Sequence, residues 1–154
     1  MTPAIKQAQK AQIQFQIHEY DHDPAAESYG EEAAEKLGVA SDRVFKTLVV
    51  AYGKDLAVAV LPVSCQLNLK QFAKAIGAKK AAMADKAVAE RVTGYVLGGV
   101  SPLGQKKALT TVIDASAQAW DTLYVSAGRR GLEIELSPED LKALTRGKFA
   151  AIGL

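Results

Sequence analysis

The chain has 154 residues, of which 49% are hydrophobic and 23% are charged. This length fits one domain spanning residues 1–154, and the hydrophobic fraction excludes a disordered protein. The net charge of +2 excludes binding to DNA or RNA through overall charge, so any contact with nucleic acid needs a local cluster of Lys and Arg.

The first half of the chain alternates between capped helices and β-rich runs. A helix is expected where an N-cap residue precedes an apolar face, and a strand where apolar and polar residues alternate or β-branched residues cluster. In chain order these signals predict a helix over 3–11, a strand over 15–20, a helix over 31–37, strands over 45–52 and 56–63, and a helix over 69–76. The turn at Gly53-Lys54-Asp55 predicts that the two long strands form a hairpin.

The second half of the chain contains shorter elements. In chain order we expect a helix from Asp85 to near Gly94, strands over 109–113, 123–126 and 132–136, and a helix from Pro138 to Gly147. About six strands and five short helices, with hairpins among them, predict an α+β fold. Its mixed or antiparallel sheet is expected to be curved.

Cysteine content and apolar runs indicate the compartment. The single cysteine cannot form an internal disulfide, which suits a reducing environment. The N-terminus lacks the apolar segment of a signal peptide, and the longest apolar run is too short to cross a membrane. We expect a soluble cytoplasmic protein with no membrane partner and no DNA partner.

Lys46 lies in an otherwise apolar strand. Strand alternation puts it on the same face as Val44, Leu48 and Val50. A lysine on such a face either lines a pocket, where a phosphate or carboxylate would favour its charged form, or protects an edge strand from aggregation. The pattern alone leaves both interpretations open.

Residues 94–104 contain four glycines and a proline, which predicts a constrained loop. Glycines let backbone N–H and C=O groups approach a ligand closely, and such groups can bind an amino acid or stabilise an oxyanion. The spacing matches neither a Walker A loop nor a dinucleotide fingerprint. A plain tight turn is the alternative.

Three basic doublets are the candidates for contact with nucleic acid. If they surround one cleft they form a phosphate-binding rim, and if they are scattered they only add solubility. The doublets are Lys79-Lys80, Lys106-Lys107 and Arg129-Arg130.

Metal binding and a protein nucleophile have weak support. His18 and His22 are the only histidines, and they flank a strand end where a solvated turn is expected. Cys65 has no histidine near it in sequence and is expected to pack in the interior, and there is no Gly-x-Ser-x-Gly elbow. We therefore expect no metal and no cofactor.

Several segments together resemble one family over nearly the whole chain. They are residues 1–4, 20–24, 45–48, 79–80, 83–85, 93–95, 98–107, 124–126 and 128–132. In these segments the chain resembles the YbaK/EbsC family, free-standing relatives of the editing domain inserted in bacterial prolyl-tRNA synthetase. The resemblance implies a barrel-like curved sheet surrounded by helices, with a pocket between the sheet and the Gly-rich loop.

The resemblance also implies the site residues. The family's lysine falls on Lys46, with Tyr20 and Gly98 as its expected catalytic partners. The substrate-binding residues implied are Tyr29, Gly99, Ser101, Pro102, Ser126 and Glu133. Two of them depart from the family pattern, because Tyr29 stands in place of a phenylalanine and Glu133 in place of an aspartate. The three basic doublets are expected to bind tRNA.

The implied activity is removal of cysteine from mischarged Cys-tRNA(Pro), and of cysteine from Cys-tRNA(Cys) as a further substrate. The thiol of the esterified cysteine would attack its own carbonyl, so that the enzyme needs no nucleophile of its own. The implied partners are tRNA and prolyl-tRNA synthetase. Two alternatives stay open: a deacylase that removes alanine or another small amino acid with water, and a non-catalytic module that binds aminoacyl-tRNA or a synthetase.

Overall fold

The computed structural model describes all residues, 1–154. It contains five α-helices, one 3-10 helix and eight strands. The helices are α1 (Pro3–Ala11), α2 (Tyr29–Leu37), α3 (Leu69–Ala75), α4 (Lys86–Thr93), η1 (Ala115–Ala119) and α5 (Pro138–Thr145). The strands are β1 (Phe15–Glu19), β2 (Phe45–Tyr52), β3 (Asp55–Pro62), β4 (Ala82–Met83), β5 (Thr110–Asp114), β6 (Leu123–Arg129), β7 (Leu132–Leu136) and β8 (Lys148–Ala150).

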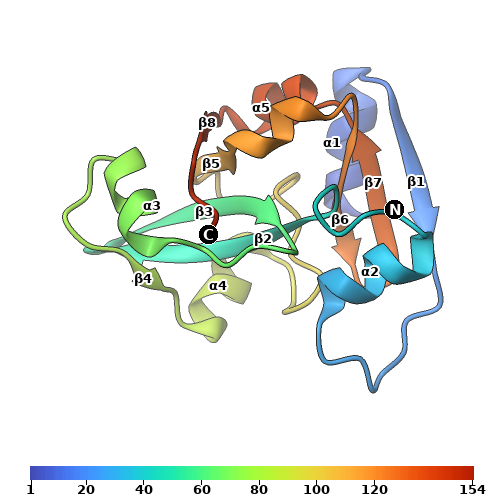
Figure 1. Cartoon of the computed structure of the whole chain (residues 1–154), viewed down its shortest axis with the longest axis horizontal. Helices are drawn as coiled ribbons and strands as arrows, with labels where there is room; N and C mark the ends of the chain where they lie inside the picture. The colour runs from blue at the N-terminus through green and yellow to red at the C-terminus, as the bar shows by residue number, and fades with distance from the viewer.

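The strands form two sheets, which run in different directions in Figure 1. The smaller sheet has the order β1-β7-β6 and is antiparallel. The larger has the order β4-β2-β3-β5-β8 and is mixed, because β5 pairs in parallel with both β3 and β8. A single parallel bridge between Val44 and Tyr124 connects the two sheets at the start of β2.

This arrangement confirms the α+β class and corrects two details. The sheets do not close into a barrel, so the expected barrel-like single sheet is wrong. There are eight strands instead of about six, because β4 and β8 were not predicted. With two and three residues, these strands are too short to show an alternating pattern.

Local sequence signals explain where the helices begin. The Ile5 N–H donates to Thr2 Oγ1 at 3.2 Å, and Pro3 occupies the first turn of α1. The same kind of cap begins the other four α-helices, at Ser28, Asn68, Asp85 and Ser137. Each of the five predicted α-helices is present, and each is preceded by a residue whose side chain caps it.

The β2–β3 hairpin is confirmed too, and β3 runs through the core. Tyr52 pairs with Asp55 across a two-residue turn. Val58 and Val60 pack into the cluster shared with β6 and β7, whereas Ala59 and Leu61 face Phe72 of α3. A strand buried on both faces reads as a continuous apolar run, as residues 56–62 do.

Helix α2 covers the outer face of the smaller sheet. Ala33 and Ala34 of α2 pack against Val44, Val63 and Tyr124. In Figure 1, α2 lies beside the lower ends of β6 and β7, close to the start of β2. The covered region is where the two sheets meet.

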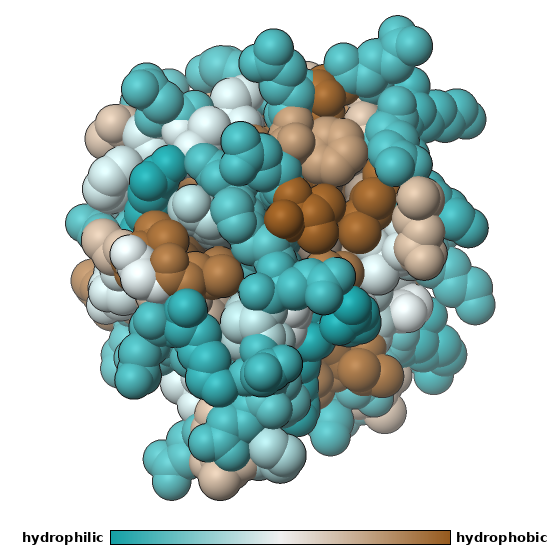
Figure 2. Space-filling model, turned by 90° about the vertical axis from the view of Figure 1, so that its right-hand side faces the viewer, coloured by the Kyte–Doolittle hydropathy of each residue, from teal (hydrophilic) through white to brown (hydrophobic).

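The exposed surface is mixed in character. Figure 2 shows the side of the molecule that carries β1, with apolar side chains in separate patches between hydrophilic ones.

No helix in the structure combines the length and the hydrophobicity needed to cross a bilayer.

Candidate active site

A pocket of about 330 Å³ lies where α2, β2, the smaller sheet and the Gly-rich loop meet. Its volume is at the lower end of the range found for ligand-binding pockets. Six residues predicted for the site line it together: Tyr20, Tyr29, Lys46, Gly98, Ser126 and Glu133. The other lining residues are Glu27, Ser28, Gly30, Val44, Phe45, Thr47, Leu48, Leu97 and Val100.

Strand β2 brings Lys46 into the pocket wall. Leu48 and Val50 pack into the core cluster beneath α3, and alternation places Lys46 on the same face near the strand's beginning. Its Nζ donates a hydrogen bond of 2.5 Å to the carbonyl oxygen of Cys65. Burial lowers the pKa of Lys46, although the nearby Cys65 and Glu31 partly oppose this. The lysine is thus a half-buried cation with protein contacts on one side and the pocket on the other.

The smaller sheet contributes a hydroxyl and a carboxyl from neighbouring strands. Ser126 of β6 and Glu133 of β7 are directly opposite each other, so their side chains lie on the same face of the sheet. The register shifts immediately after Ser126, and a bulge of this kind commonly re-aims side chains beside active sites. Ser126 Oγ accepts the N–H of Gly128 at 3.1 Å.

Glu133 and Glu135 share this face but differ in environment. Glu133 is only 6% exposed, and burial raises its pKa to about 8. Burial would also raise the pKa of Glu135, but hydrogen bonds from Thr122, His18 and Tyr124 outweigh it and the pKa is lowered. At neutral pH Glu133 therefore carries a proton, so the pocket contains a neutral carboxyl group that can donate a hydrogen bond.

Tyr20 follows β1 and lies beside this carboxyl. Its backbone N–H donates to the carbonyl of Gly131 at 3.0 Å, which continues the β1–β7 ladder by one residue. Burial, together with the charge that Glu133 can carry, raises the pKa of Tyr20 to about 12. The phenol is neutral over the physiological pH range and can both donate and accept a hydrogen bond.

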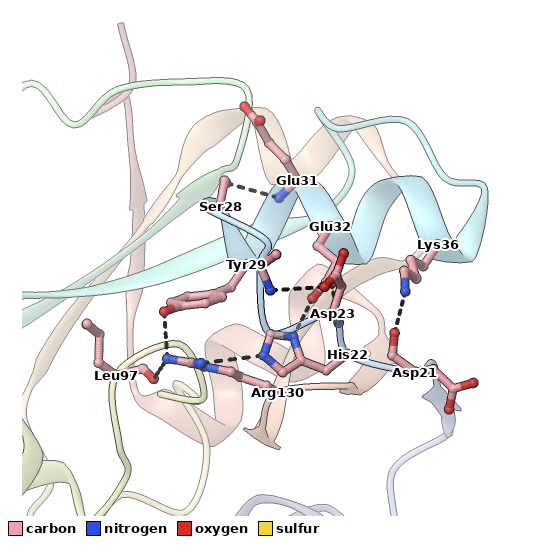
Figure 3. Close-up of polar contacts among 11 residues, drawn as sticks. Asp21, His22, Asp23, Ser28, Tyr29, Glu31, Glu32, Lys36, Leu97 and Arg130 are labelled. Atoms are coloured by element: carbon pink, nitrogen blue, oxygen red, sulfur yellow. Dashed lines mark hydrogen bonds and ion pairs between the residues drawn. The ribbon is translucent and has the colours of Figure 1, made fainter.

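Tyr29 begins α2 and closes the pocket together with the Gly-rich loop. The next residue, Gly30, lets the start of α2 lie directly against Val63, since a Cβ there would lie 2.3 Å from Cγ1 of Val63. Arg130 contacts both Tyr29 and Leu97, as Figure 3 shows. The guanidinium of Arg130, one of the residues expected to bind tRNA, thus lies among protein groups.

The Gly-rich loop is constrained, as predicted, but only part of it faces the pocket. Tyr95 Oη donates to the carbonyl of Leu103 at 2.6 Å and ties the two ends of the loop together. Ser101 is fully buried, and its Oγ accepts the N–H of Leu103. Gly99 and Pro102 do not line the pocket either, and Pro102 borders a separate hollow beside α1. Of residues 98–102, only Gly98 and Val100 line the pocket, together with the preceding Leu97.

The basic doublets do not surround the pocket. Lys79 and Lys80 are exposed at the opposite end of β2, where β4 pairs with Val50 and Ala51. Lys106 and Lys107 are exposed beyond the Gly-rich loop, and the guanidinium of Arg129 is 3.9 Å from the carboxylate of Glu19. None of these five residues is among those that line the pocket.

Both histidines are engaged with carboxylates. His18 lies 2.9 Å from Glu135, and His22 lies 2.7 Å from Glu32. No three His, Cys, Asp or Glu side chains are close enough together to hold a metal ion. Cys65 has a free thiol that packs beside Gly153, outside the pocket.

Thr47 is a pocket residue that sequence reasoning missed. Alternation assigns it to the face opposite Lys46, so the pattern predicted no contact with the site. Its Oγ1 is buried and is the one buried side-chain polar atom without a hydrogen-bond partner.

Thr47→Val is therefore expected to raise the free energy of unfolding by about 1 kcal/mol, because a buried hydroxyl without a partner is costly. Chemical denaturation measures the change. Thr111→Val is the matched control: this hydroxyl donates to Leu109 at 3.0 Å, so its loss should lower stability. Destabilisation by both substitutions would contradict the prediction.

Comparison with known proteins identifies the family of the chain. Residues 22–144 match the family model of the aminoacyl-tRNA editing domain. EbsC of Enterococcus faecalis, named as a proposed Cys-tRNA(Pro)/Cys-tRNA(Cys) deacylase, is 40% identical over 98% of this chain and 92% of its own length.

Solved structures share the fold. A hypothetical protein aligns over 99% of this chain and all of its own, with a TM-score of 0.89 and 22% identity. A proposed trans-editing enzyme for prolyl-tRNA synthetase aligns over all of this chain and 99% of its own, with a TM-score of 0.83 and 21% identity. Matched over most of its length by the family model and over nearly all of it by EbsC, the chain belongs to the family of aminoacyl-tRNA editing domains.

Proposed function

We propose that this chain is an aminoacyl-tRNA deacylase that removes cysteine from mischarged tRNA, with Cys-tRNA(Pro) as its principal substrate and Cys-tRNA(Cys) as a second one. The whole chain, residues 1–154, would act as one editing domain. Family membership and the name of the EbsC relative support this proposal. The observation that carries it is a small pocket that combines Lys46 with Gly98 and contains neither a cysteine nor a histidine.

The lining residues explain why the nucleophile would come from the substrate. Ser126 of β6 has a hydroxyl in the pocket, but it has no histidine partner that could take its proton, and its Oγ already accepts from Gly128. Cys65 lies outside the pocket. A cysteinyl ester brings a thiol of its own.

In the proposed reaction the substrate thiol attacks its own ester carbonyl. The sulfur–carbon bond forms, the bond from carbon to the ribose oxygen breaks, and the thiol proton ends on that oxygen. The products are a cyclic thiolactone and tRNA with a free 3′ end. Holding the chain in the reactive conformation can contribute roughly 7–11 kcal/mol in well-oriented intramolecular reactions, so orientation is the main task of the protein.

Each pocket group has a proposed task in this reaction. Lys46 would place its cation near the leaving ribose oxygen or the terminal phosphate and stabilise the developing charge. The backbone around Gly98, with Ser126, would hold the aminoacyl carbonyl and the α-amine. The neutral carboxyl of Glu133 and the phenol of Tyr20 would orient the thiol or the amine through hydrogen bonds.

The deciding assay compares Cys-tRNA(Pro), Ala-tRNA(Pro) and S-methylcysteinyl-tRNA(Pro) side by side. We expect deacylation of Cys-tRNA(Pro) only, because alanine and S-methylcysteine lack the free thiol. EDTA should leave the rate unchanged. Release of alanine alone would replace the thiol mechanism with attack by water, and no turnover of any substrate would indicate a binding module.

We also propose that tRNA contacts a basic hollow beside α4. Three cations, Lys54, Arg91 and Lys107, line it with the single carboxylate of Asp55, and none of the three forms a salt bridge. Few cations imply weak contact with little sequence preference, so selection of a particular tRNA would depend on a partner such as prolyl-tRNA synthetase.

Reversal of Lys106 and Lys107 to Glu is expected to flatten the salt dependence of tRNA binding. Each lost phosphate contact should reduce the slope of log K against log salt by roughly 0.7–0.9. Fluorescence anisotropy with labelled tRNA at several salt concentrations measures the slope. Lys70→Glu on the exposed side of α3 is the control, and an equal change in both variants would refute a local site.

A further inference from the structure

We propose that Arg130 is a positioning residue that fastens the Gly-rich loop to Tyr29 and thereby limits the size of the amino acid that the pocket admits. The idea rests on the proposed function for the identity of the ligand. Arg130 lies in the turn between β6 and β7, far in sequence from both groups that it contacts.

The guanidinium joins two walls of the pocket. Arg130 Nη2 donates to Tyr29 Oη at 2.6 Å and to the carbonyl of Leu97 at 3.2 Å (Figure 3). Its central carbon also lies 3.8 Å from the centroid of the Tyr29 ring, within the range of a cation–π contact. Tyr29 and Leu97 both line the pocket, so the Arg130 side chain connects the pocket wall formed by α2 to the wall formed by the Gly-rich loop.

A second set of contacts holds Arg130 itself. Arg130 Nη1 lies 3.4 Å from His22 Nε2, and His22 Nδ1 lies 2.7 Å from Glu32 Oε1. Because a guanidinium only donates, Nε2 accepts, and Nδ1 carries the proton and donates to the glutamate. Glu32 is 7% exposed, and its other oxygen accepts the Asp23 N–H at 2.7 Å.

The charge of Glu32 is stable in this setting. Burial alone would raise its pKa, but the hydrogen bonds from His22 and the Asp23 backbone, with the charge of Lys36, lower it. A carboxylate, an imidazole and a guanidinium therefore follow one another from α2 to the pocket wall. This chain of contacts fixes where the Arg130 side chain points.

The Gly-rich loop packs at Gly98 directly against the side chains of Arg130 and Tyr29. A Cβ at Gly98 would lie 2.5 Å from Arg130 Nε and 2.6 Å from Tyr29 Cδ2, and Gly98 has a φ of +87°. Only glycine fits this position without displacement of the pair. The contact makes the loop position depend on Arg130.

Little else holds this part of the loop in place. Val96 and Leu97 are 64% and 48% exposed, so neither side chain between the buried Tyr95 and Gly98 anchors the loop in the interior. The remaining tethers are the Leu97 N–H to Glu90 at 2.7 Å and the Gly99 N–H to the Val96 carbonyl at 2.9 Å. Without Arg130 the loop and Tyr29 can move apart, and the pocket widens.

The test measures binding and loop motion together. The probes are 3′-amide-linked aminoacyl-adenosines with cysteine and leucine side chains, which cannot be cleaved, so the result does not depend on turnover. Arg130→Met is expected to reduce the preference for the cysteinyl probe roughly fivefold or more, which corresponds to the loss of about one hydrogen bond. Hydrogen exchange at residues 96–99 should accelerate by a similar factor.

Tyr29→Phe is the second variant, and it removes only the hydroxyl that Arg130 contacts. We expect a smaller shift of the same kind, no additional loss in the double variant, and partial recovery with Arg130→Lys, which keeps the charge but not the planar fork. Arg129→Met removes the same charge from the neighbouring position and should leave loop exchange unchanged.

Two outcomes would overturn the proposal. Unchanged loop exchange in Arg130→Met would show that the arginine does not hold the loop. Equal weakening of both probes, together with a flatter salt dependence of tRNA binding, would make Arg130 a phosphate contact. Neither outcome bears on whether wild-type protein deacylates Cys-tRNA(Pro), which the turnover assay decides separately.

Discussion

Lys46→Ala is expected to lower kcat/KM for Cys-tRNA(Pro) by roughly 10²–10³-fold, the usual effect of removing a group that stabilises developing charge. The loss should fall mainly on kcat, because the cation is proposed to act on the leaving oxygen. Single-turnover kinetics with saturating enzyme separates this step from binding. Lys46→Arg should retain part of the rate, since it keeps a positive charge near the same place.

The matched control is Lys70→Ala on the exposed side of α3, which should leave the rate unchanged. Lys46→Ala should also leave the fold intact, because burial already disfavours the charged form of Lys46. A Lys46→Ala protein that keeps its full rate would exclude the proposed role. In that case the pocket could still bind the aminoacyl group, but without electrostatic help from this lysine.

Glu133→Gln is expected to abolish much of the pH dependence of stability between pH 5 and 8. The pKa of Glu133 is raised from 4.5 to about 8 in the folded protein, so the folded state binds more protons than the unfolded state in this interval. Stability from this group is fully present below pH 4.5 and is lost as pH rises through about 8. The loss in the wild type should be on the order of 3 kcal/mol, at about 1.4 kcal/mol per pH unit.

Urea denaturation at pH 5, 6, 7 and 8 measures this effect. Glutamine has nearly the same shape as glutamate and does not ionise, so the stability of the Glu133→Gln protein should change little over this pH interval. Glu135→Gln on the same strand is the control. Its folded pKa is lowered, so the stability it contributes is present above the unfolded pKa and is lost only as pH falls through the lower folded value. Parallel pH profiles for wild type and Glu133→Gln would contradict the assigned burial.

Local chemistry in the sequence was sufficient to predict most elements. A cap such as Thr2 acts within one helical turn, and the Gly53-Lys54 turn acts within one hairpin, so neighbouring residues carry the whole signal. The inward direction of Lys46 followed from strand alternation in the same way, as one of two interpretations. The family resemblance supplied Tyr20, Tyr29, Ser126 and Glu133 as pocket residues, and the structure brings all four to one cavity.

Features that depend on contacts between distant segments required the tertiary structure. Strands β4 and β8 exist only because longer strands pair with them, so their own two or three residues carry no pattern. Glu133 and Glu135 look equivalent in the sequence, and only the neighbouring segments bury one and leave the other partly exposed. Arg129 and Arg130 are adjacent in the sequence, but Arg129 lies near Glu19 whereas Arg130 contacts Tyr29, because different segments pack beside them.

The sequence by itself therefore determined the positions of the five α-helices and the hairpin, because these follow from interactions among residues close together in the chain. The family resemblance added a short set of candidate site residues. The tertiary structure decided which candidates share the pocket, separating Gly98 from Ser101 and Pro102 and turning Arg130 toward Tyr29. Packing between segments far apart in sequence determines the burial of a side chain, its pKa and the groups that it contacts, and no local pattern encodes these properties.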